Sequence, residues 1–399
     1  LHTSLELSLL RKLLNTLKLI AFLPYFPVLF IMVILRPLLI IRIGRLWNDR
    51  IGHFSANTEL YLCEQDAKIN TPKGNYIDLF FVRGRICNSY LLKMWKREII
   101  VMPTAILYPV YFLIQNLNIF KRNIVPEPKG LDRDIFNLFD KYDCHLRFTE
   151  IEENYGKKEL NRLGIRTPFV CLNVRDSAYF PDKSSEYHSY RDCDINNYTL
   201  AVRKLNELGY FVVRMGAKVN QALNINSTNF IDYATIKGFR SEFLDIYLAE
   251  KCFFSISTST GWDSLPYMFK KPIVYAPIIP FGAFFTFSRK AIGIPKKYKI
   301  NNKNLNIKDI FNSGYAYFLT SEEYRNNDII LEEPTQQEIW DVVEEMIELI
   351  KTDFALDLSS KQKDFFTLLK SNPTPLKKYD FHGICYQGRI GSRYLESNF

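Results

Sequence analysis

Short apolar runs alternate along the chain with longer segments whose apolar side chains recur at helical spacing. Runs typical of strands occupy residues 38–43, 59–63, 77–82, 99–102, 169–174, 210–214, 252–257 and 272–275. Helical patterns mark residues 87–95, 197–208, 241–249, 335–350 and 360–369. Strands separated by helices of about 10–15 residues indicate βαβ units and a parallel sheet. The pattern therefore predicts an α/β fold.

The alternation occurs twice, and a polar stretch at residues 130–163 separates the two series. A chain of 399 residues is also longer than a domain with a single hydrophobic core usually is, which favours two or three domains. We therefore expect two facing Rossmann-like domains, an N-terminal one over residues 37–165 and a C-terminal one over 166–350. The remaining helices and tail, residues 351–399, are expected to pack on the N-terminal domain.

The amino-terminal residues contain a long uncharged run. Residues 19–35 read LIAFLPYFPVLFIMVIL, with Lys18 before the run and Arg36 after it. These seventeen residues are at the lower limit for a helix that spans a bilayer, and their two prolines would kink it. We expect residues 1–36 to form a hydrophobic segment that lies in the membrane interface or re-enters it. A single spanning helix and a buried hairpin of core helices are the alternatives.

The basic excess of the chain is concentrated near this segment. The formal net charge is +9, and residues 1–50 carry seven basic residues against two acidic ones, so they contribute +5. Basic charge beside apolar sequence indicates an anionic membrane surface rather than nucleic acid, because no basic stripe alternates with aromatic residues. We therefore expect a cytoplasmic protein, associated with the inner face of the cell membrane, that binds no nucleic acid.

The seven cysteines and five histidines are scattered, and no two cysteines form a C-x-x-C pair. An odd number of unpatterned cysteines argues against a disulfide framework and against a structural zinc site. The D-x-D pattern at Asp192 and Asp194 stands just before a predicted helix, where Asp194 is better explained as a helix cap. The sequence thus predicts neither a bound metal nor a resident cofactor.

Small hydroxyl residues follow the strand-like run at 252–257. The loop contains, in order, Ser257, Thr258, Ser259, Thr260, Gly261, Trp262, Asp263 and Ser264. Small residues let the backbone approach an anion, and the first turn of the helix expected after them offers unpaired N–H groups. The loop is therefore a candidate diphosphate site. The alternative is a plain helix cap made by Thr260 or Asp263.

Arginines end two further strands of the same half. Arg175 and Arg214 each close a strand-like run, and Gly216 follows the second. Ligands of open α/β sheets bind at the carboxyl ends of strands, and guanidinium groups match phosphate oxygens. Arg175, Arg214 and Gly216 are therefore predicted to join the hydroxyl loop around a phosphate-bearing ligand. The alternative is a surface ion pair, such as Arg175 with Asp176.

The first half offers one candidate base. His53 follows two glycine-containing turns after the first predicted strand, and histidine is the side chain that titrates nearest neutral pH. It could take a proton from an acceptor hydroxyl. We place Arg45, His53 and Asn57 on the acceptor side, with His53 and Arg175 as the catalytic residues. A histidine that only caps or packs is the alternative.

The chain resembles a family of bacterial glycosyltransferases associated with surface-polysaccharide gene clusters. The stretches that carry the resemblance are RIGRLWNDRIGHFSANTELYLCEQD at 42–66, CNSYLLKMWKR at 87–97, VCLNVRDSAYF at 170–180, YHSYRDCDINNY at 187–198, GYFVVRMG at 209–216, IDYATIKGFRSEFLDIYLAEKCFFSISTSTGWDSLPYMFKKPIVY at 231–275, IPKK at 294–297 and GRIGSRYLESN at 388–398. VRDSAY and SISTSTGWDS are more distantly similar to the arginine-containing and hydroxyl-rich loops of fucosyltransferase-like folds.

This resemblance implies a GT-B-type architecture with the nucleotide-sugar donor in the C-terminal domain. It implies that residues 257–261 hold the donor diphosphate, that Arg175 neutralises it, and that Arg214 and Gly216 lie on the adjacent loop. The expected activity is metal-independent transfer of a sugar from a nucleotide-sugar co-substrate to a lipid-linked or polysaccharide acceptor in surface-glycan biosynthesis. The alternatives are a nucleotide-sugar epimerase or hydrolase on the same fold and a non-catalytic, membrane-attached carbohydrate-binding protein.

Overall fold

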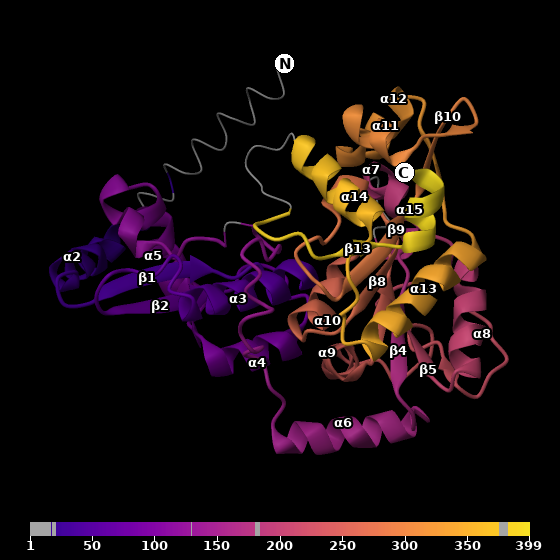
Figure 1. Ribbon diagram of the computed structural model, residues 1–399. Coiled ribbons are helices and arrows are strands. Elements are labelled where there is room, and N and C mark those ends of the chain that lie inside the picture. Colours follow the sequence, from indigo (N-terminus) through magenta and orange to yellow (C-terminus); the bar gives the residue numbers. More distant parts are fainter. Residues whose placement is uncertain (1–16, 18–20, 129, 180–183, 375–381) are drawn as a thin grey trace. The chain divides into compact units, whose positions relative to one another are not determined.

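The chain folds into two compact units (Figure 1). The computed structural model describes residues 17, 21–128, 130–179, 184–374 and 382–399. The first unit comprises the residues up to Arg50 together with Glu64–Glu127, and the second comprises Ile51–Cys63 together with Pro128–Phe399. Each unit contains a parallel sheet, so the mixed α/β fold that the hydrophobic pattern predicts is confirmed.

A three-stranded parallel sheet forms the centre of the first unit. Its order is β1-β2-β3, with bounds β1 (Ile40–Arg45), β2 (Tyr76–Phe81) and β3 (Ile100–Val101). The helical segments are η1 (Leu23–Tyr25), α2 (Phe26–Leu35), α4 (Ser89–Glu98), α5 (Thr104–Gln115) and η2 (Asn118–Asn123), where η marks a 3₁₀ helix. The strand-like runs at 38–43, 77–82 and 99–102 are thus confirmed as strands, and they are neighbours in one sheet.

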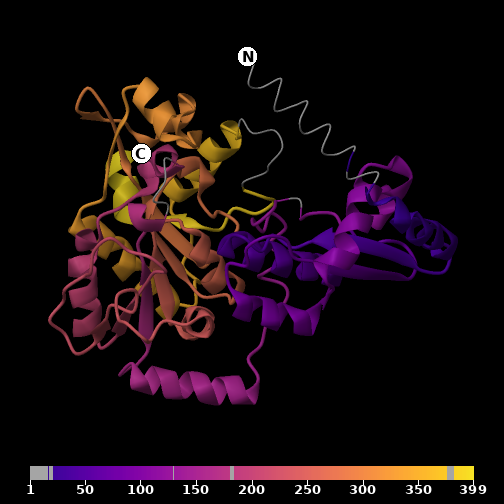
Figure 2. The same cartoon turned by 180° about the vertical axis from the view of Figure 1, so that it is seen from behind.

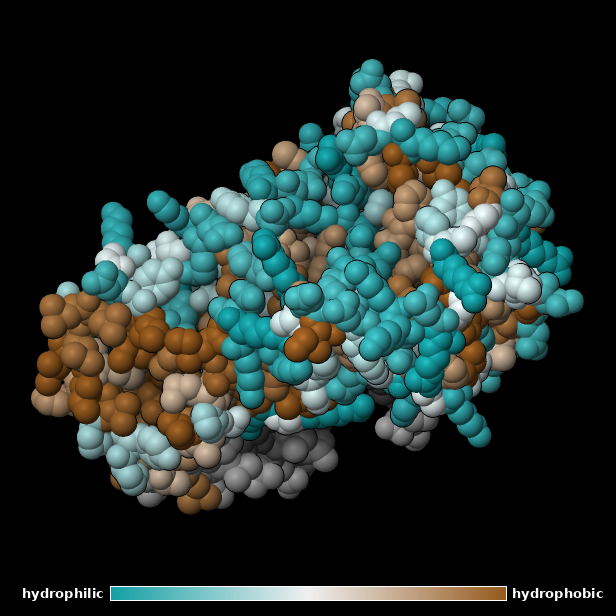
Figure 3. Space-filling view, turned by 90° about the horizontal axis from the view of Figure 1, so that it is seen from below, coloured by the Kyte–Doolittle hydropathy of each residue, from teal (hydrophilic) through white to brown (hydrophobic). Residues whose placement is uncertain are grey.

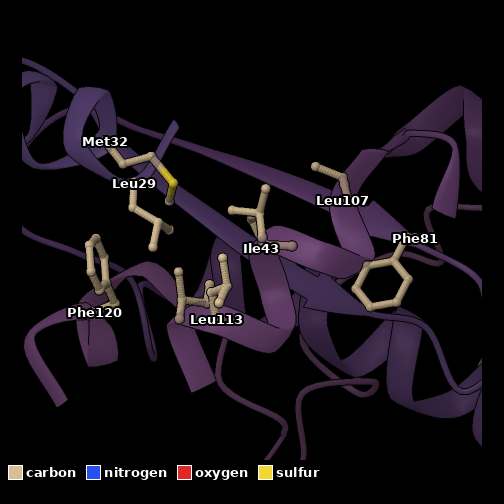
Figure 4. Close-up of a cluster of buried hydrophobic side chains, with 9 residues drawn as sticks. Leu29, Met32, Ile43, Phe81, Leu107, Leu113 and Phe120 are labelled. Atoms are coloured by element: carbon tan, nitrogen blue, oxygen red, sulfur yellow. The ribbon is translucent and has the colours of Figure 1, made fainter. Parts of the chain in front are cut away.

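Apolar side chains of α2, α5 and the first two strands form the core of the first unit (Figure 4). The buried members are Leu29, Met32, Ile43, Phe81, Leu107, Val110, Leu113, Ile114 and Phe120. α2 buries only Leu29 and Met32, whereas its Phe30 and Ile34 are more than half exposed. Because α2 is apolar all round, this core covers only part of its apolar surface.

Helix α3 (Ile51–Asp66) takes the place of a predicted strand. The apolar run at 59–63 suggested a strand, but these residues lie inside the helix. Phe54, Ala56, Leu60 and Cys63 are all buried. A helix buried on most sides lacks the regular apolar stripe by which a surface helix is recognised, so its period is hidden in the sequence. The strand prediction at 59–63 is therefore wrong.

A seven-stranded parallel sheet forms the centre of the second unit (Figures 1 and 2). Its order is β13-β9-β8-β7-β4-β5-β6, and every neighbouring pair is parallel. The bounds are β4 (Phe169–Asn173), β5 (Phe211–Met215), β6 (Phe230–Ile231), β7 (Phe254–Ser257), β8 (Ile273–Ile278), β9 (Ala291–Pro295) and β13 (Arg389–Ile390). Strands β4 and β7 are neighbours whose last residues pair, so the loops that follow them start side by side.

Helices connect the strands of this sheet. The α-helices are α6 (Glu150–Arg162), α7 (Ser184–Tyr187), α8 (Thr199–Glu207), α9 (Glu242–Lys251), α10 (Ser264–Met268), α11 (Ile307–Asn312), α12 (Ser321–Asn326), α13 (Gln336–Lys351), α14 (Ser360–Ser371) and α15 (Ser392–Asn398). The 3₁₀ segments are η3 (Ser177–Tyr179), η4 (Ser189–Arg191), η5 (Ile195–Tyr198), η6 (Gly261–Asp263), η7 (Phe281–Ala283) and η8 (Tyr315–Tyr317). A small antiparallel sheet of order β11-β10-β12 adds β10 (Lys297–Ile300), β11 (Lys303–Asn304) and β12 (Ile330–Glu332).

The tail of the chain extends the sheet of the second unit. Arg389 of β13 pairs with Ile292 of β9, and α15 packs on α13 and α14. We predicted that residues 351–399 pack on the N-terminal domain, and the described tail residues instead belong to the second unit. The physical reason is β9, a short buried strand whose edge accepts the tail and which the hydrophobic pattern did not reveal.

The boundary between the units also differs from the predicted one. We predicted a boundary after residue 165, whereas the first unit ends at Glu127 and most of α3 joins the second unit. Arg133 donates to the carbonyl oxygens of Ala283 and Phe284 at 2.8 and 2.9 Å. Such long-range hydrogen bonds fasten the polar stretch to the second unit, and a polar stretch carries no periodic pattern that would reveal this.

No helix in the described part of the chain is long and apolar enough to cross a membrane. α2 has ten residues, which is about 15 Å of helix. The predicted hydrophobic segment over residues 1–36 lies partly outside the described residues, which include 17 and 21–36 of it.

Candidate functional site

The hydroxyl loop, residues 257–264, begins where β7 ends and closes on itself through Asp263. This buried carboxylate accepts hydrogen bonds from the Ser257 hydroxyl, from the Thr260 N–H at 2.6 Å and from the Thr260 hydroxyl at 3.1 Å. Burial raises the pKa of Asp263 to about 6. Thr260 is the N-cap of η6 in a capping box with Asp263, so the predicted alternative of a cap by these residues is confirmed. Ser264, which begins α10, is also buried.

The middle of the loop has a backbone conformation that is unusual outside glycine. Ser259 has a φ of 58°, in the left-handed region, which costs a non-glycine residue about 1–2 kcal/mol. The preceding Thr258 is fully buried, and its hydroxyl accepts from the Arg175 N–H at 2.9 Å. Backbone held in such a conformation by its surroundings is a feature of ligand-binding turns.

Arg175 follows β4 and lies beside this loop. The β4 residue Asn173 donates to the Thr260 hydroxyl at 2.6 Å, which ties the two strand ends together. The Arg175 Nε donates to an Asp192 carboxylate oxygen at 3.2 Å, and its side chain is 13% exposed. The predicted alternative of an ion pair is therefore present, with Asp192 instead of Asp176 as the partner. The structure thus brings Arg175 and the hydroxyl loop together, as the strand-end pattern predicts.

Arg191 is a second arginine at the same loop, and no local pattern in the sequence marks it. It ends η4, and its Nη2 donates to the Ser259 carbonyl oxygen. Its Nε is buried and has no hydrogen-bond partner among the described residues. Burial lowers the pKa of Arg191, and the nearby Arg175 lowers it as well. An anion bound to both guanidinium groups would relieve their repulsion and supply the missing partner.

The third predicted arginine, Arg214, forms its hydrogen bonds away from the hydroxyl loop. It is 1% exposed, and its Nη1 donates to Asp232 at 2.8 Å and to the Gln221 carbonyl oxygen at 2.6 Å. Gly216 lies in the turn after the same strand. Arg214 makes no hydrogen bond to the hydroxyl loop within the described residues, and its geometry is that of a buried ion pair.

The predicted base, His53, lies in the first turn of α3 and within the second unit. The neighbouring Gly52 packs so closely on the hydroxyl loop that a Cβ on it would lie 3.0 Å from the Gly261 carbonyl oxygen. The His53 Nδ1 lies 3.4 Å from the Asn57 amide oxygen and 3.7 Å from a carboxylate oxygen of Asp132. An imidazole beside a carboxylate is the arrangement of an oriented general base. The structure thus adds Asp132 to the predicted set.

Arg45, the remaining residue predicted on the acceptor side, belongs to the first unit. It ends β1, and its guanidinium carbon lies 5.7 Å from the centroid of the Trp47 ring. The Trp47 indole N–H donates to Glu127 at 3.1 Å. These contacts are all internal to the first unit, and they hold Arg45 at the carboxyl end of its strand.

The D-x-D aspartates have separate roles. Asp194 caps η5 by accepting from the Asn196 N–H at 2.9 Å, so the prediction that Asp194 is a helix cap is confirmed. Asp192 is the partner of Arg175, and its backbone oxygen accepts from the Lys296 ammonium at 2.6 Å. The two aspartates thus have different partners.

A set of metal-binding side chains that no sequence pattern predicted meets in the second unit. The ligand atoms of Glu59, Cys63 and His145 lie within 4.8 Å of one another. The prediction of no structural zinc site relied on the lack of C-x-x-C pairs. This set combines two helix residues with a histidine more than eighty positions later, so cysteine spacing could not reveal it.

Comparison with known proteins gives structural neighbours only. No family model matches the chain, and no curated protein matches it in sequence. It is similar to the ADP-heptose LPS heptosyltransferase II of E. coli, with 15% identity and a TM-score of 0.41, over 78% of this chain and 100% of that one. It is also similar to a family 9 glycosyltransferase from Veillonella parvula, with 11% identity and a TM-score of 0.45, over 77% of this chain and 97% of that one.

A third similar structure is the S. aureus MnaA–UDP co-structure, with 8% identity and a TM-score of 0.27, over 86% of this chain and 93% of that one. The first two neighbours are glycosyltransferases.

Proposed function

We propose that the protein is a glycosyltransferase that moves a sugar from a nucleotide-sugar donor to a lipid-linked or glycan acceptor in surface-glycan biosynthesis. The observation that carries the proposal is that the Arg175 backbone N–H and the Arg191 guanidinium both hydrogen bond to one hydroxyl loop, which has a left-handed residue at Ser259. Two neighbouring guanidinium groups, of which one has a buried and unpartnered Nε, favour a ligand with at least two negative charges. A nucleoside diphosphate meets this requirement.

The arginines would act on the leaving group. When the bond between the sugar and the diphosphate breaks, negative charge develops on the phosphate oxygen that leaves. Guanidinium groups held in place before the reaction stabilise this charge, and they bind phosphate oxygens through paired N–H groups. Arg175 and Arg191 supply this stabilisation from the protein itself, so the proposed reaction needs no metal ion on the diphosphate.

His53 would act on the acceptor. Its imidazole takes the proton of the acceptor hydroxyl while that oxygen forms a bond to the anomeric carbon and the diphosphate departs. Asp132 and Asn57 orient the ring. Gly52, the residue before His53, packs closely on Gly261 of the hydroxyl loop, and this contact supports a base on the same side of the proposed site. The donor and acceptor halves of the reaction are thus adjacent within one unit.

We propose further that α2 holds the enzyme on the inner face of the cell membrane, where a lipid-linked acceptor is found. Phe26, Phe30, Ile31 and Ile34 of this helix are between 44% and 67% exposed. Figure 3 shows apolar side chains gathered at the left of its view, the end at which Figure 1 places α2. An apolar face of this kind is suited to the boundary between headgroups and acyl chains.

Basic side chains accompany this apolar face. Arg36, which caps the end of α2, donates to the Ile119 carbonyl oxygen at 3.1 Å and so fastens η2 to the helix. Lys121 and Arg122 of η2 are both exposed. Each basic residue near an anionic bilayer contributes about 1 kcal/mol of attraction. The combination supports an interfacial position of the first unit.

The donor assignment is tested by binding of nucleotides to the full chain. The names of the similar structures mention ADP-heptose and UDP, so ADP and UDP join GDP, CMP and dTDP as probes in a thermal-shift screen. A nucleotide present at 100 times its Kd stabilises the protein by about 2.7 kcal/mol. We expect at least one nucleoside diphosphate to do so.

Variants then test the two arginines. Arg175→Ala and Arg191→Ala should each weaken the binding of that nucleotide about 10- to 100-fold, because each removes charge-assisted hydrogen bonds. Arg325→Ala is the matched control, since this arginine is 61% exposed and pairs with Glu186 at the surface. Equal nucleotide binding by the wild type and Arg191→Ala would refute the diphosphate assignment.

A further inference from the structure

Side chains of three metal-binding types meet on the inner face of α3. Glu59 and Cys63 are four residues apart on the helix and so lie on one face, and His145 reaches them from the segment that precedes α6. All three belong to the second unit, and their ligand atoms lie within 4.8 Å of one another. We propose that this cluster binds one transition-metal ion of the zinc type, which fastens α3 to the segment at 144–145.

The separations fit a tetrahedral zinc ion. The Glu59 Oε1 lies 3.0 Å from the His145 Nδ1 and 3.8 Å from the Cys63 Sγ. Zinc bonds of roughly 2.0–2.3 Å place the ligand atoms of a tetrahedral site about 3.3–3.8 Å apart. The three side chains therefore need only small shifts to admit an ion. A mixed set of nitrogen, oxygen and sulfur donors favours zinc over magnesium or calcium, which take oxygen ligands.

The Glu59 carboxylate points to the same conclusion. Glu59 is 1% exposed, and its Oε2 is buried with no hydrogen-bond partner among the described residues. The other oxygen, Oε1, also accepts from the His145 backbone N–H at 3.1 Å. A buried carboxylate is costly unless it is paired or coordinates a metal. A bound cation would supply the charge and the missing contact together.

The set contains three protein ligands, one from each of Glu59, Cys63 and His145. Cys144, which precedes His145 in the chain, is not among the residues whose ligand atoms lie within 4.8 Å of one another. The place of the proposed ion along α3 indicates a structural role. The proposed ion lies on the helix that carries His53, six residues or about 9 Å further along the axis. It would therefore fix the position of α3 without taking part in the sugar transfer.

The test begins with the metal content of the full chain. The protein is purified without a histidine tag, dialysed against metal-free buffer and analysed by mass spectrometry of its elements. We expect about one zinc ion per chain. Glu59→Gln, Cys63→Ser and His145→Asn should each weaken zinc binding at least tenfold, because each removes one ligand. Cys252→Ser is the matched control, since this buried cysteine lies outside the cluster, and it should keep the zinc.

Two measurements on the wild-type chain keep the test decisive if the variants do not fold. A chelator should lower the Tm, and added zinc should restore it. Cobalt added to the metal-free protein should give the absorption bands of thiolate-bound tetrahedral cobalt. The proposal is overturned if the wild type holds no metal, keeps its Tm under chelation and shows no cobalt–thiolate band. It is equally overturned if all three ligand variants bind zinc as the wild type does.

Discussion

At the scale of single residues, the hydroxyl loop divides into a part that holds its own shape and a part that faces two arginines. Thr260 and Asp263 hydrogen bond to each other within the loop. The Ser259 carbonyl oxygen instead accepts a hydrogen bond from the Arg191 guanidinium. The sequence predicts Arg175, because the residues that follow a parallel strand lie at a known edge of the sheet. It could not predict Arg191. That residue is placed by a long-range bond, from the neighbouring Tyr190 N–H to Ser321, which no local pattern encodes.

Asp263 gives a pH dependence of stability that can be measured. Burial raises its pKa from the usual value of 3.8 to about 6, so between about pH 4 and 6 the native state holds a proton that the unfolded chain has lost. The contribution of Asp263 to the free energy of unfolding is therefore complete below about pH 4, and it is lost as the pH rises to about 6. The loss amounts to roughly 3 kcal/mol at most.

Urea unfolding between pH 4 and 7 checks this expectation. The wild type should lose stability over the window, and Asp263→Asn should show a shallower slope. Asp134 and Asp245, whose pKa values burial also raises to about 6, preserve part of the slope in that variant. Asp309→Asn is the control at an exposed position and should leave the slope unchanged. A slope that is identical in the wild type and Asp263→Asn would contradict the account.

At the scale of elements, most strands of the two parallel sheets were predictable from the sequence. The short strands β9 and β13 and the buried helix α3 were not. The runs that became β4, β5, β7 and β8 are continuous and apolar because both faces of a parallel sheet are buried. β9 and β13 are short, and β13 forms only through pairing with a strand nearly a hundred residues earlier. The apolar run at 59–63 was mistaken for a strand because α3 is buried on most sides.

The close packing of α3 on the hydroxyl loop predicts that Gly52 tolerates no larger side chain. A Cβ at this position would lie 3.0 Å from the Gly261 carbonyl oxygen and 3.4 Å from the Ser264 hydroxyl, and neither backbone nor a buried side chain can yield freely. Gly52→Val should therefore lower the free energy of unfolding by about 1–3 kcal/mol and displace His53, with loss of activity. Lys158→Val on the exposed side of α6 controls for valine in a helix. Unchanged stability and activity in Gly52→Val would show that the contact is unimportant.

The exposed face of α2 makes a prediction about membranes. Phe30→Ser combined with Ile34→Ser should weaken the binding of the full chain to vesicles that contain anionic lipid, because each serine removes apolar surface from the interface. Sedimentation with vesicles measures the effect, and we expect a loss of at least tenfold. Ile151→Ser is the matched control, since Ile151 is 82% exposed on α6 in the second unit. If the double variant binds vesicles like the wild type, α2 is not the docking element.

At the scale of the whole molecule, the two α/β units were predictable from the repeated alternation of strands and helices. Which segments belong to which unit was not predictable, because this depends on packing between segments far apart in the chain. Most of α3 belongs to the second unit, and this places His53 in the same unit as the hydroxyl loop. The sequence order alone had assigned His53 to the first domain. The proposed base and the proposed diphosphate site therefore do not depend on how the two units are arranged.

The central claim is that the second unit transfers a sugar from a nucleotide donor. It is tested most directly by incubating the full chain with a labelled nucleotide-sugar whose nucleotide stabilises it, with and without a membrane lipid extract as acceptor source. We expect the label to move to the lipid fraction with the wild type and Arg325→Ala. His53→Ala and Arg191→Ala should reduce the rate at least 100-fold, as the loss of a base or of leaving-group stabilisation predicts. Donor consumption at the same rate without the extract, with no labelled lipid, would contradict the claim.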